Sequence, residues 1–454
     1  MERHCGKDGI LKTQTSDMTK GTPIKVIAYF AIPLFIGTLF QQAYNIIDTM
    51  IAGHKLGDDA IAAIGATAAL YSVLIYFANG MNNGFGVVMA QIFGSRNIAK
   101  MRKAVAAAVI LNTATTVLLT AAVLPFLRLL LKLLDTPADI FEMSYRYIFI
   151  ILAGMIATIA YNMCAGFMRA VGNSRTPLYF LIISCAVNIG LDFLFIMGMN
   201  MGVVGAALAT VLAQLISAVF CAVYIMKKYG GFMPDKSDWR IPWDLAKEML
   251  STGASMGLMS SVLAIGSIIL QKGINNLGKD IITAHTASRR IFEFLMMPLQ
   301  AIANACATFV GQNFGAKQFE RIRRSMKQVL WLELAWSLVS AAVAFPGGGF
   351  LVRIVTGTDN ADIIANAAYN LEVCTVFFFP LGILFVLRNS MQAMGHKIAP
   401  VFSSGIELAV KVLSCIFVIP VMKYKGIVFT EPVIWALCAV FLAAVYLRKK
   451  FVCS

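Results

Sequence analysis

The chain carries about twelve apolar stretches, each long enough to cross a lipid bilayer as a helix. Hydrophobic residues make up 59% of its 454 residues and charged residues 13%, and the mean hydropathy is +0.76, which is outside the range of soluble globular proteins. We therefore expect an all-α integral membrane protein, because a spanning helix satisfies its own backbone groups within the bilayer. The expected spans are 24–53, 60–92, 103–127, 141–167, 177–199, 202–226, 247–272, 281–313, 326–352, 366–391, 398–420 and 428–447.

Two motifs occur twice. Q-I-F-G-S-R at Gln91–Arg96 returns as Q-N-F-G-A-K at Gln312–Lys317, and A-V-G-N-S-R-T-P at Ala170–Pro177 returns as A-M-G-H-K-I-A-P at Ala393–Pro400. The offsets are 221 and 223 residues, so one duplication of about half the chain accounts for both motifs. An even number of spans per repeat predicts two parallel, pseudo-symmetric six-helix bundles, and such a repeat in an apolar chain is typical of transporters.

The expected domain organisation follows from the repeat. It consists of a cytoplasmic tail, an N-lobe, a polar cytoplasmic linker, a C-lobe and a second cytoplasmic tail, at 1–23, 24–226, 227–246, 247–447 and 448–454. We expect no cleavable signal peptide, because about 25 mainly polar residues precede a first apolar run that is long enough to span the membrane.

The basic residues predict the orientation in the membrane. The N-terminus, the loops after even-numbered spans and the C-terminus, counted together with the basic residues at the edges of the adjoining spans, hold 25 of the 38 lysine and arginine residues. Because basic segments stay on the cytoplasmic side during insertion, both termini are expected in the cytoplasm of a multi-pass cell-membrane protein. The net charge of +15 is then mostly a matter of topology. It is spread over seven short segments, so we do not expect nucleic-acid binding.

Residues that would indicate an enzyme are scarce. The four histidines form no H-E-x-x-H motif, and the nine cysteines include no C-x-x-C pair. We therefore expect neither an enzyme nor a protein with a bound cofactor.

Acidic residues inside apolar spans are the candidate functional groups, because an ionisable side chain is costly to place in hydrocarbon. Six qualify: Asp48, Asp192, Glu293, Glu333, Glu372 and Glu407. In the first half, Asn45 precedes Asp48 by three residues and Asn188 precedes Asp192 by four, so each pair shares one helix face. Such oxygen-rich faces can hold a proton or a hard cation. The alternative is that these groups only hydrogen-bond helices together.

Several segments together resemble the multidrug and toxic compound extrusion (MATE) family. They are P-L-F-I-G-T-L-F-Q-Q-A-Y-N-I-I-D-T-M-I-A-G at Pro33–Gly53, A-I-A-A-I-G-A at Ala60–Ala66, N-I-G-L-D-F-L-F-I at Asn188–Ile196 and the doubled Q-x-F-G-x-[RK]. The resemblance implies a polyspecific antiporter of the bacterial plasma membrane, acting as a monomer. Such a protein exports small organic cations or drugs while H⁺ or Na⁺ enters, by rocking of two six-helix lobes.

The first lobe is similar to the DinF-like branch of that family. The resemblance assigns cation coupling and substrate competition to Asp48, Tyr147, Asn162, Asn188, Asp192 and Thr210. If the coupling ion is Na⁺, its ligands would be Asp48, Asn188, Asp192 and Thr210. Gln42 and Asn45 are secondary candidates. In the second lobe, the stretches where the NorM-like branch carries acids read A-S-M-G-L-M-S-S-V-L and F-F-F-P-L-G-I-L-F-V, which argues for coupling in the first lobe.

Four further features are interpreted from their positions. Pro33 lies 15 residues before Asp48 and is a candidate helix hinge, because proline lacks the N–H of a regular helix. Glu407 and Lys411, also secondary candidates, are spaced to form an i,i+4 ion pair, with the alternative that Lys411 supplies positive charge opposite the first-lobe site. Glu293 is expected to pair with Arg289 or Arg290. The basic run Lys317–Lys327 is expected to contact membrane lipids.

Other transport functions stay open. A flippase for lipid-linked precursors or polysaccharides, from the same superfamily, is the main alternative, although we would expect it to have a strongly basic cavity. The loop after the second span lacks the G-x-x-x-D-R-x-G-R-R signature of the major facilitator family. A channel fits less well, because acids confined to one lobe suit an alternating-access site better than a symmetric pore.

Overall fold

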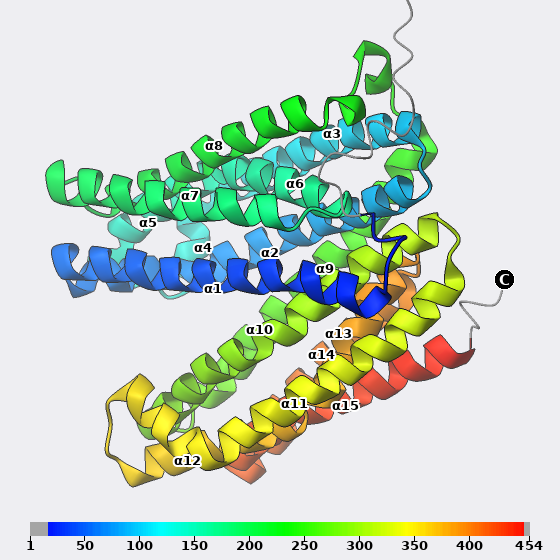
Figure 1. Cartoon of the computed structure of the whole chain (residues 1–454). Coiled ribbons are helices and arrows are strands. Elements are labelled where there is room, and N and C mark those ends of the chain that lie inside the picture. Colours follow the sequence, from blue (N-terminus) through cyan, green and yellow to red (C-terminus); the bar gives the residue numbers. More distant parts are fainter. Residues whose placement is uncertain (1–16, 449–454) are drawn as a thin grey trace, which may run out of the picture. The chain divides into compact units, whose positions relative to one another are not determined.

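The computed structural model describes residues 17–448, and for Thr49 and Ala52 only the backbone. The described chain is almost entirely helical and contains no strand (Figure 1). It divides into two compact units. Among the described residues, the N-terminal unit consists of Asp17 and Ile36–Ser260, and the C-terminal unit consists of Met18–Phe35 and residues 261–448. Their boundaries run through the first helix and through the helix that follows the predicted linker.

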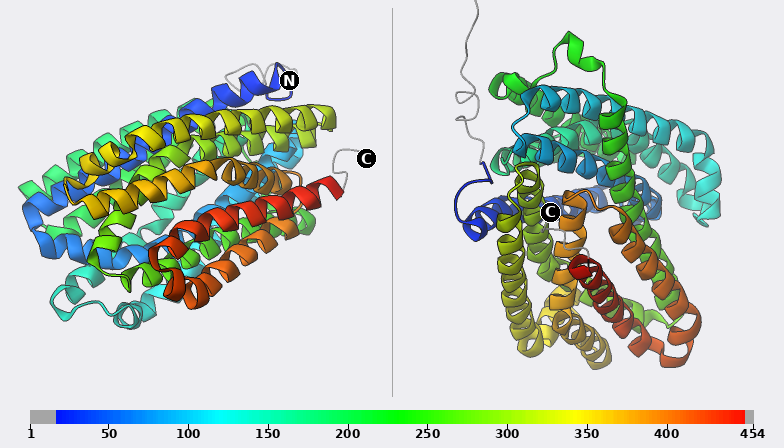
Figure 2. Two further views of the ribbon diagram at one scale, coloured as in Figure 1. Left: turned by 90° about the horizontal axis from the view of Figure 1, so that it is seen from below. Right: turned by 90° about the vertical axis from the view of Figure 1, so that its right-hand side faces the viewer.

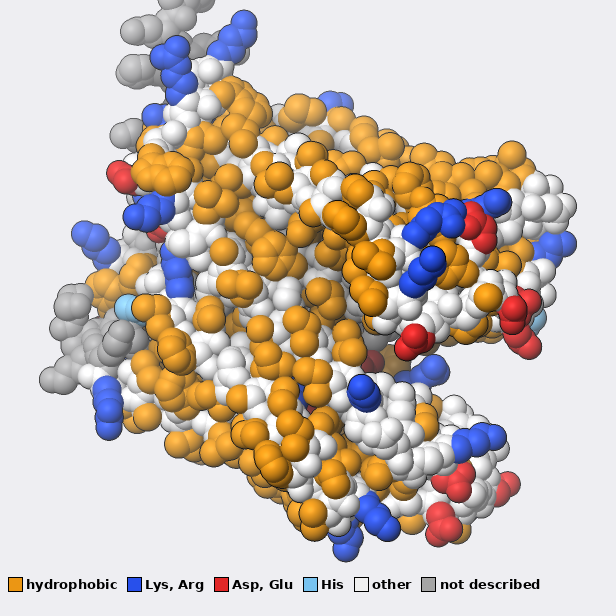
Figure 3. Space-filling view, turned by 180° about the vertical axis from the view of Figure 1, so that it is seen from behind, with side chains coloured by type: hydrophobic (Ala, Val, Ile, Leu, Met, Phe, Trp, Pro, Cys, Tyr) orange, Lys and Arg blue, Asp and Glu red, His pale blue; other side chains and the backbone are white. Residues whose placement is uncertain are grey.

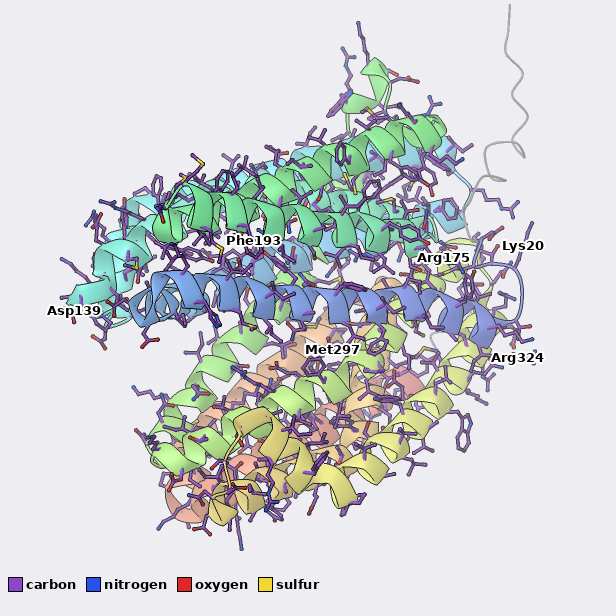
Figure 4. All side chains as sticks on the ribbon, turned by 60° about the vertical axis from the view of Figure 1, so that its left-hand side comes forward. Lys20, Asp139, Arg175, Phe193, Met297 and Arg324 are labelled. Carbon is purple, nitrogen blue, oxygen red and sulfur yellow. The ribbon has the colours of Figure 1, made fainter. Side chains whose placement is uncertain are left out.

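The helices of the N-terminal unit run alongside one another as a bundle (Figure 1). They are the part of α1 (Pro23–Leu56) from Ile36 onward, α2 (Asp58–Gly94), α3 (Ile98–Val123), α4 (Leu127–Leu133), α5 (Ala138–Ala153), α6 (Met155–Ala170), α7 (Arg175–Asp192), α8 (Gly202–Lys228) and the start of α9 (Trp243–Asn275). Asp139 at the start of α5 and Arg175 at the start of α7 lie at opposite ends of this bundle (Figure 4). This placement agrees with the alternation of loops that the predicted spans require.

The C-terminal unit contains a second bundle, whose helices also run lengthwise beside one another (Figure 2). Besides the start of α1 and the rest of α9, its helices are α10 (Lys279–Gly315), α11 (Phe319–Thr356), α12 (Ala361–Val376), α13 (Phe378–Ala393), α14 (Ile398–Leu413) and α15 (Ile419–Arg448). The guanidinium of Arg321 ties the chain before α1 to this unit by donating to the carbonyl oxygens of Met18, Lys20 and Gly21 at 2.8–3.2 Å.

Twelve membrane crossings account for the described helices. Nine helical segments are long and apolar enough to span, and two bent pairs, α5 with α6 and α12 with α13, raise the number to eleven. Ile398–Arg448 has 51 residues, about 76 Å of helix, far more than the roughly 30 Å hydrocarbon core. Its backbone leaves the helical region at Lys423 (φ 50°, ψ −131°), which divides it into two spans. The predicted all-α, twelve-span architecture is confirmed.

Two expected spans are not straight helices. The continuous spans predicted at 141–167 and 366–391 are broken near their centres, with bends of 42° at Gly154 and 51° at Phe377. Hydropathy alone does not reveal such a bend, because the residues on both sides of it are equally apolar. The two breaks are 223 residues apart, so the duplication has preserved the bend as well as the motifs.

The backbone repeats the duplication in detail. Residues with positive φ recur at offsets of 221 to 223: Gly57 and Gly278, Arg96 and Lys317, Asp135 and Gly357, Gly172 and Gly395, Asn200 and Lys423. Each doubled sequence motif contains one of these pairs, because a left-handed residue is a common way to end a helix. The π-helical turns Phe193–Gly198 and Ser414–Val418 are related in the same way.

Small residues let α2 and α9 approach closely inside the N-terminal unit. A Cβ atom added to Gly84 would lie 2.6 Å from the Cα of Gly253, and one added to Gly80 would lie 2.7 Å from the Cα of Gly257. Backbone contact through glycine is a common way to pack helices in membranes, where lipid tails are as apolar as leucine. Further along α2, Phe85 and Met89 are fully buried in the core of the unit.

The outer faces of the helices carry the signature of a membrane protein. On the face shown in Figure 3, hydrophobic side chains cover most of the surface along the helices, and charged side chains gather mainly towards the helix ends. Large apolar residues such as Leu118, Trp331 and Val440 are 69–71% exposed. These surfaces are suited to contact with lipid tails rather than with water.

Candidate functional site

Four helices of the N-terminal unit bring the candidate residues together. Asp48 comes from α1, Asn188 and Asp192 from α7, Thr210 from α8 and Tyr147 from α5. Asn188 and Asp192 are one helical turn apart, so both side chains point in the same direction. Both are also buried, with 1% and 0% exposure. Asp192 closes α7 immediately before the π-helical turn that starts at Phe193.

The two carboxyl groups lie against each other. The side chains of Asp48 and Asp192 are hydrogen-bonded to one another. Such a bond requires a proton on at least one of the two groups. In the described part of the chain, the Oδ1 atom of each has no N–H or O–H donor within reach, and no basic side chain pairs with either. The arrangement is a buried acidic site that a proton or a cation can satisfy.

The amide of Asn188 links this pair to α8 and α1. In the orientation that satisfies its neighbours, its nitrogen donates to Asp192 Oδ2 at 3.0 Å and to the Tyr44 hydroxyl at 3.3 Å. Its oxygen accepts from the backbone N–H of Thr210 at 3.1 Å. The Thr210 hydroxyl in turn donates to the carbonyl of Ala206 at 3.1 Å and bonds with Tyr44. Each end of the amide is therefore occupied.

Two tyrosines complete the cluster. Tyr147, which the resemblance assigned to cation coupling, interacts electrostatically with both Asp48 and Asp192. Tyr44 interacts with both carboxyl groups as well, and sequence reasoning missed it. The signal that could have found Tyr44 is its position four residues before Asp48, one turn away on the same helix face.

Other predicted members of the site have different partners. Asn162 on α6 donates from its side chain to Asn79 on α2 at 2.8 Å. Asn45 is exposed within the unit and donates to Gln42 at 3.4 Å. Pro33 lies in α1, which continues as a helix through it, and is buried within the C-terminal unit.

Charged side chains in the C-terminal unit, some buried and some partly exposed, form a chain of ion pairs, which we call the ion-pair ladder. Its members are Arg388 on α13, Glu407 and Lys411 on α14, Glu431 on α15, and Arg289 and Glu293 on α10. Glu407 accepts from Arg388 at 3.4 Å and from Lys411 at 3.2 Å. Glu431 lies 3.7 Å from Lys411 and 2.8 Å from Arg289.

The ladder combines predicted and unpredicted pairs. The i,i+4 pairs Glu407–Lys411 and Arg289–Glu293 are present, the second at 3.2 Å. Spacing along the sequence predicted no partner for Arg388 and did not identify Glu431. The reason is that the ion pairs of Arg388 and of Glu431 join different helices. The six charges balance, so the ladder offers no excess charge for a substrate and is suited to holding four helices together.

A repeated, all-helical chain of twelve spans with a buried acidic pair in one half defines a membrane transport protein. The chain belongs to the MatE family, whose profile matches residues 33–194 and 256–417. The two matched segments have equal length and are offset by 223 residues, in agreement with the internal duplication. The resemblance to the MATE family is thereby confirmed.

Curated relatives and solved structures agree with this assignment. The probable multidrug resistance protein YpnP of Bacillus subtilis is 27% identical over 84% of both chains. The multidrug export protein MepA of Staphylococcus aureus is 23% identical over 92% of this chain and 91% of its own. An outward-facing multidrug resistance MATE family transporter of the MOP superfamily has a TM-score of 0.89 at 21% identity, covering 97% and 99% of the chains. A MATE protein in its bent conformation has a TM-score of 0.88 at 20% identity, covering 96% and 98%.

Proposed function

We propose that this protein is a secondary active multidrug efflux antiporter, which exports organic, mostly cationic compounds in exchange for an inward ion. The observation that carries the proposal is the pair formed by the partly buried Asp48 and the fully buried Asp192, which has no basic partner among the described residues. The names of the relatives YpnP and MepA support the substrate class. A cationic substrate and the inward ion would compete for the same negative charge, and this competition would couple their movements.

The geometry favours H⁺ over Na⁺ as the coupling ion. A sodium ion bound by Asp48, Asn188, Asp192 and Thr210 would need oxygen ligands, because hard cations bind oxygen. Asn188 instead presents its nitrogen to Asp192 and turns its oxygen to the backbone of Thr210. A proton needs no such ligand set, and a hydrogen bond between the two carboxyl groups can hold one.

Efflux of ethidium from membrane vesicles tests this function. We expect a pH gradient to drive efflux in the wild type, and a sodium gradient at constant pH to have no effect. Asp48→Asn and Asp192→Asn should abolish gradient-driven efflux, because an amide cannot release a proton. Asp139→Asn is the matched control, since Asp139 is exposed at the start of α5. Efflux driven by sodium alone would overturn the choice of ion.

The same assay addresses the alternative function. If neither gradient moves the dye, a flippase for lipid-linked precursors or polysaccharides of the same superfamily becomes the better assignment. That reading would need a basic substrate site, whereas the described acidic pair in the N-terminal unit is negative and the ion-pair ladder is neutral.

Pro33 is the proposed hinge of α1. Because proline lacks an N–H, the helix has one fewer hydrogen bond to break where it bends. Protonation of Asp48 would then be linked to bending at Pro33. The boundary between the two units crosses α1 between Phe35 and Ile36, next to this residue. Pro33→Ala should slow efflux while leaving ethidium binding close to that of the wild type, and unchanged efflux would remove Pro33 from the mechanism.

The proposal extends to the oligomeric state, the membrane and the orientation of the chain in it. The protein acts as a monomer in the bacterial plasma membrane, with both termini in the cytoplasm, in contact with membrane lipids and without a cofactor or an enzymatic activity. The bias of basic residues towards one set of loops supports the orientation. The predicted tails, 1–23 and 448–454, lie largely outside the described residues.

A further inference from the structure

One carboxyl group of the C-terminal unit stands apart from the ion-pair ladder. Glu333, near the middle of α11, is 0% exposed, and neither of its carboxyl oxygens has a hydrogen-bond partner in the described chain. Glu407 and Glu431, by contrast, each lie within 4 Å of two basic side chains. A carboxylate without such compensation is strongly disfavoured in an apolar interior, whereas the neutral acid is tolerated.

The neighbouring helix provides a recess for this carboxyl group. Gly382 on α13 faces Glu333, and a Cβ atom added there would lie 2.8 Å from Oε2 and 2.9 Å from the Cβ of the glutamate. Any larger residue at position 382 would therefore collide with the carboxyl group. Gly382 follows the break at Phe377 by five residues, so the recess lies close to the point where α12 and α13 bend by 51°.

Titratable and charged groups on the helices packed against α11 do not neutralise Glu333. From α10 the neighbour is the Cys306 thiol, which interacts with Glu333 but contributes no positive charge, and whose Sγ lies 3.7 Å from the Ser390 hydroxyl. Arg388 on α13 is turned to Ser403 and Glu407 on α14. On α12, Glu372 is a further acid and makes no ion pair within the described chain.

We propose that Glu333 is a second proton-binding site, which holds its proton while α11 packs against α13 and releases it to water when that contact opens. Deprotonation in the closed arrangement would leave an uncompensated negative charge beside Gly382. Proton loss and opening of the contact therefore favour each other, because a coupling between two equilibria is reciprocal. The site does not depend on the Asp48–Asp192 pair, which belongs to the other unit.

Infrared difference spectroscopy of the purified full-length protein in liposomes tests the proposal directly, because it detects the C=O stretch of a protonated carboxyl group. We expect a carboxylic-acid band at neutral pH that is lost in Glu333→Gln and that disappears from the wild type as the pH is raised. The same band should persist in Asp48→Asn. Failure of antiport coupling through Asp48 would therefore leave this result unchanged.

Two glycine variants make the test independent of the folding of Glu333→Gln. Gly382→Ala retains the Glu333 carboxyl group, but the added methyl group presses on it. The infrared band of this carboxyl group should therefore shift or disappear. Gly347→Ala is the matched control, because a Cβ atom at Gly347 on α11 meets no atom within 4 Å, and its band should not move.

Transport provides the second readout. At alkaline pH, the rate of ethidium efflux by the wild type should still depend on pH. In Glu333→Gln, this dependence at alkaline pH should be lost. Two results would overturn the proposal. One is the absence of any Glu333-dependent band, which would mean that the group is ionised. The other is a band that never changes with pH, together with a wild-type pH profile of efflux in Glu333→Gln, which would make Glu333 a permanently neutral structural acid.

Discussion

At the scale of single residues, the acidic pair depends on the direction in which the Asn188 amide points. One nitrogen serves both Asp192 and Tyr44, and the oxygen is taken by the backbone of α8. Spacing along α7 predicted that Asn188 and Asp192 share a face, but not which atom of the amide faces the carboxyl group. That choice follows from the Thr210 N–H, which only the packed helix α8 supplies.

Removing the Tyr44 hydroxyl should weaken the site without destroying it. Tyr44→Phe deletes an acceptor of the Asn188 nitrogen and a partner of Thr210, so we expect a loss of about 1 kcal/mol, or roughly a fivefold change in apparent proton affinity. The pH dependence of ethidium efflux measures it. Tyr179→Phe, at a tyrosine that is 61% exposed, should behave as the wild type. An effect as large as that of Asp48→Asn would show that Tyr44 has a more direct role.

Asn188→Asp should be more damaging than Asn188→Ala. A third carboxyl group would replace the donor to Asp192 and add like charge to a buried site, whereas alanine only removes the hydrogen bonds. We expect gradient-driven efflux to fall further in the aspartate variant, and the deficit to shrink as the pH is lowered and the extra carboxyl group is neutralised. A deficit that is independent of pH would contradict this account.

At the scale of helices, the ion-pair ladder joins α10, α13, α14 and α15. Sequence spacing found the pairs within one helix, because residues four apart on a helix are always neighbours. Pairs between helices, such as Arg388 with Glu407, depend on how each helix is rotated about its axis. Contact through glycine between α2 and α9 is a second case of this kind.

Glu407→Gln should destabilise the protein much more than Glu293→Gln. Loss of the Glu407 charge leaves Arg388 and Lys411 buried without their shared partner, for which we expect about 3–5 kcal/mol. Glu293 is 41% exposed, and Arg289 retains Glu431, so about 0–1 kcal/mol is expected there. Thermal unfolding of the purified variants in detergent measures both. Equal melting temperatures would show that the ladder does not hold the helices together.

The close contact of α2 and α9 should be sensitive to a single methyl group. Gly84→Ala places a Cβ atom 2.6 Å from Gly253, so we expect a loss of about 1–3 kcal/mol through forced separation of the helices. Gly65→Ala on the same helix is the control, because nothing lies within 4 Å of its added Cβ. Thermal unfolding that is unchanged in Gly84→Ala would show that the contact can relax without cost.

At the scale of the whole molecule, the duplication accounts for the alternation of loops between two sides of the membrane. Each repeat has six spans, so corresponding loops of the two halves face the same side. Lys100 belongs to the first doubled loop region, and Asp139 follows one span later, at the opposite end of the N-terminal unit from Arg175 (Figure 4). The bias of basic residues predicts that the Lys100 side faces the cytoplasm.

Cysteine labelling in intact cells tests this orientation. A membrane-impermeant maleimide should label Asp139→Cys from outside, and should label Lys100→Cys only after the membrane is permeabilised. The unmodified chain gives the background, and of its described cysteines all but the partly buried Cys415 are buried. Labelling of Lys100→Cys in intact cells would mean that the orientation is reversed.

By itself, the sequence determined the twelve spans, the duplication, the family and the acids that lie within the membrane. These features are local or periodic along the chain. The bilayer requires each spanning helix separately to be long and apolar, so the spans and the acids within them can be recognised without knowledge of the packing. Only the tertiary structure decided which acids meet. It placed Asp48 against Asp192, gave Arg388 its partner and left Glu333 alone beside Gly382. Such contacts depend on the packing and axial rotation of helices far apart in sequence, which hydropathy and spacing within one helix do not specify.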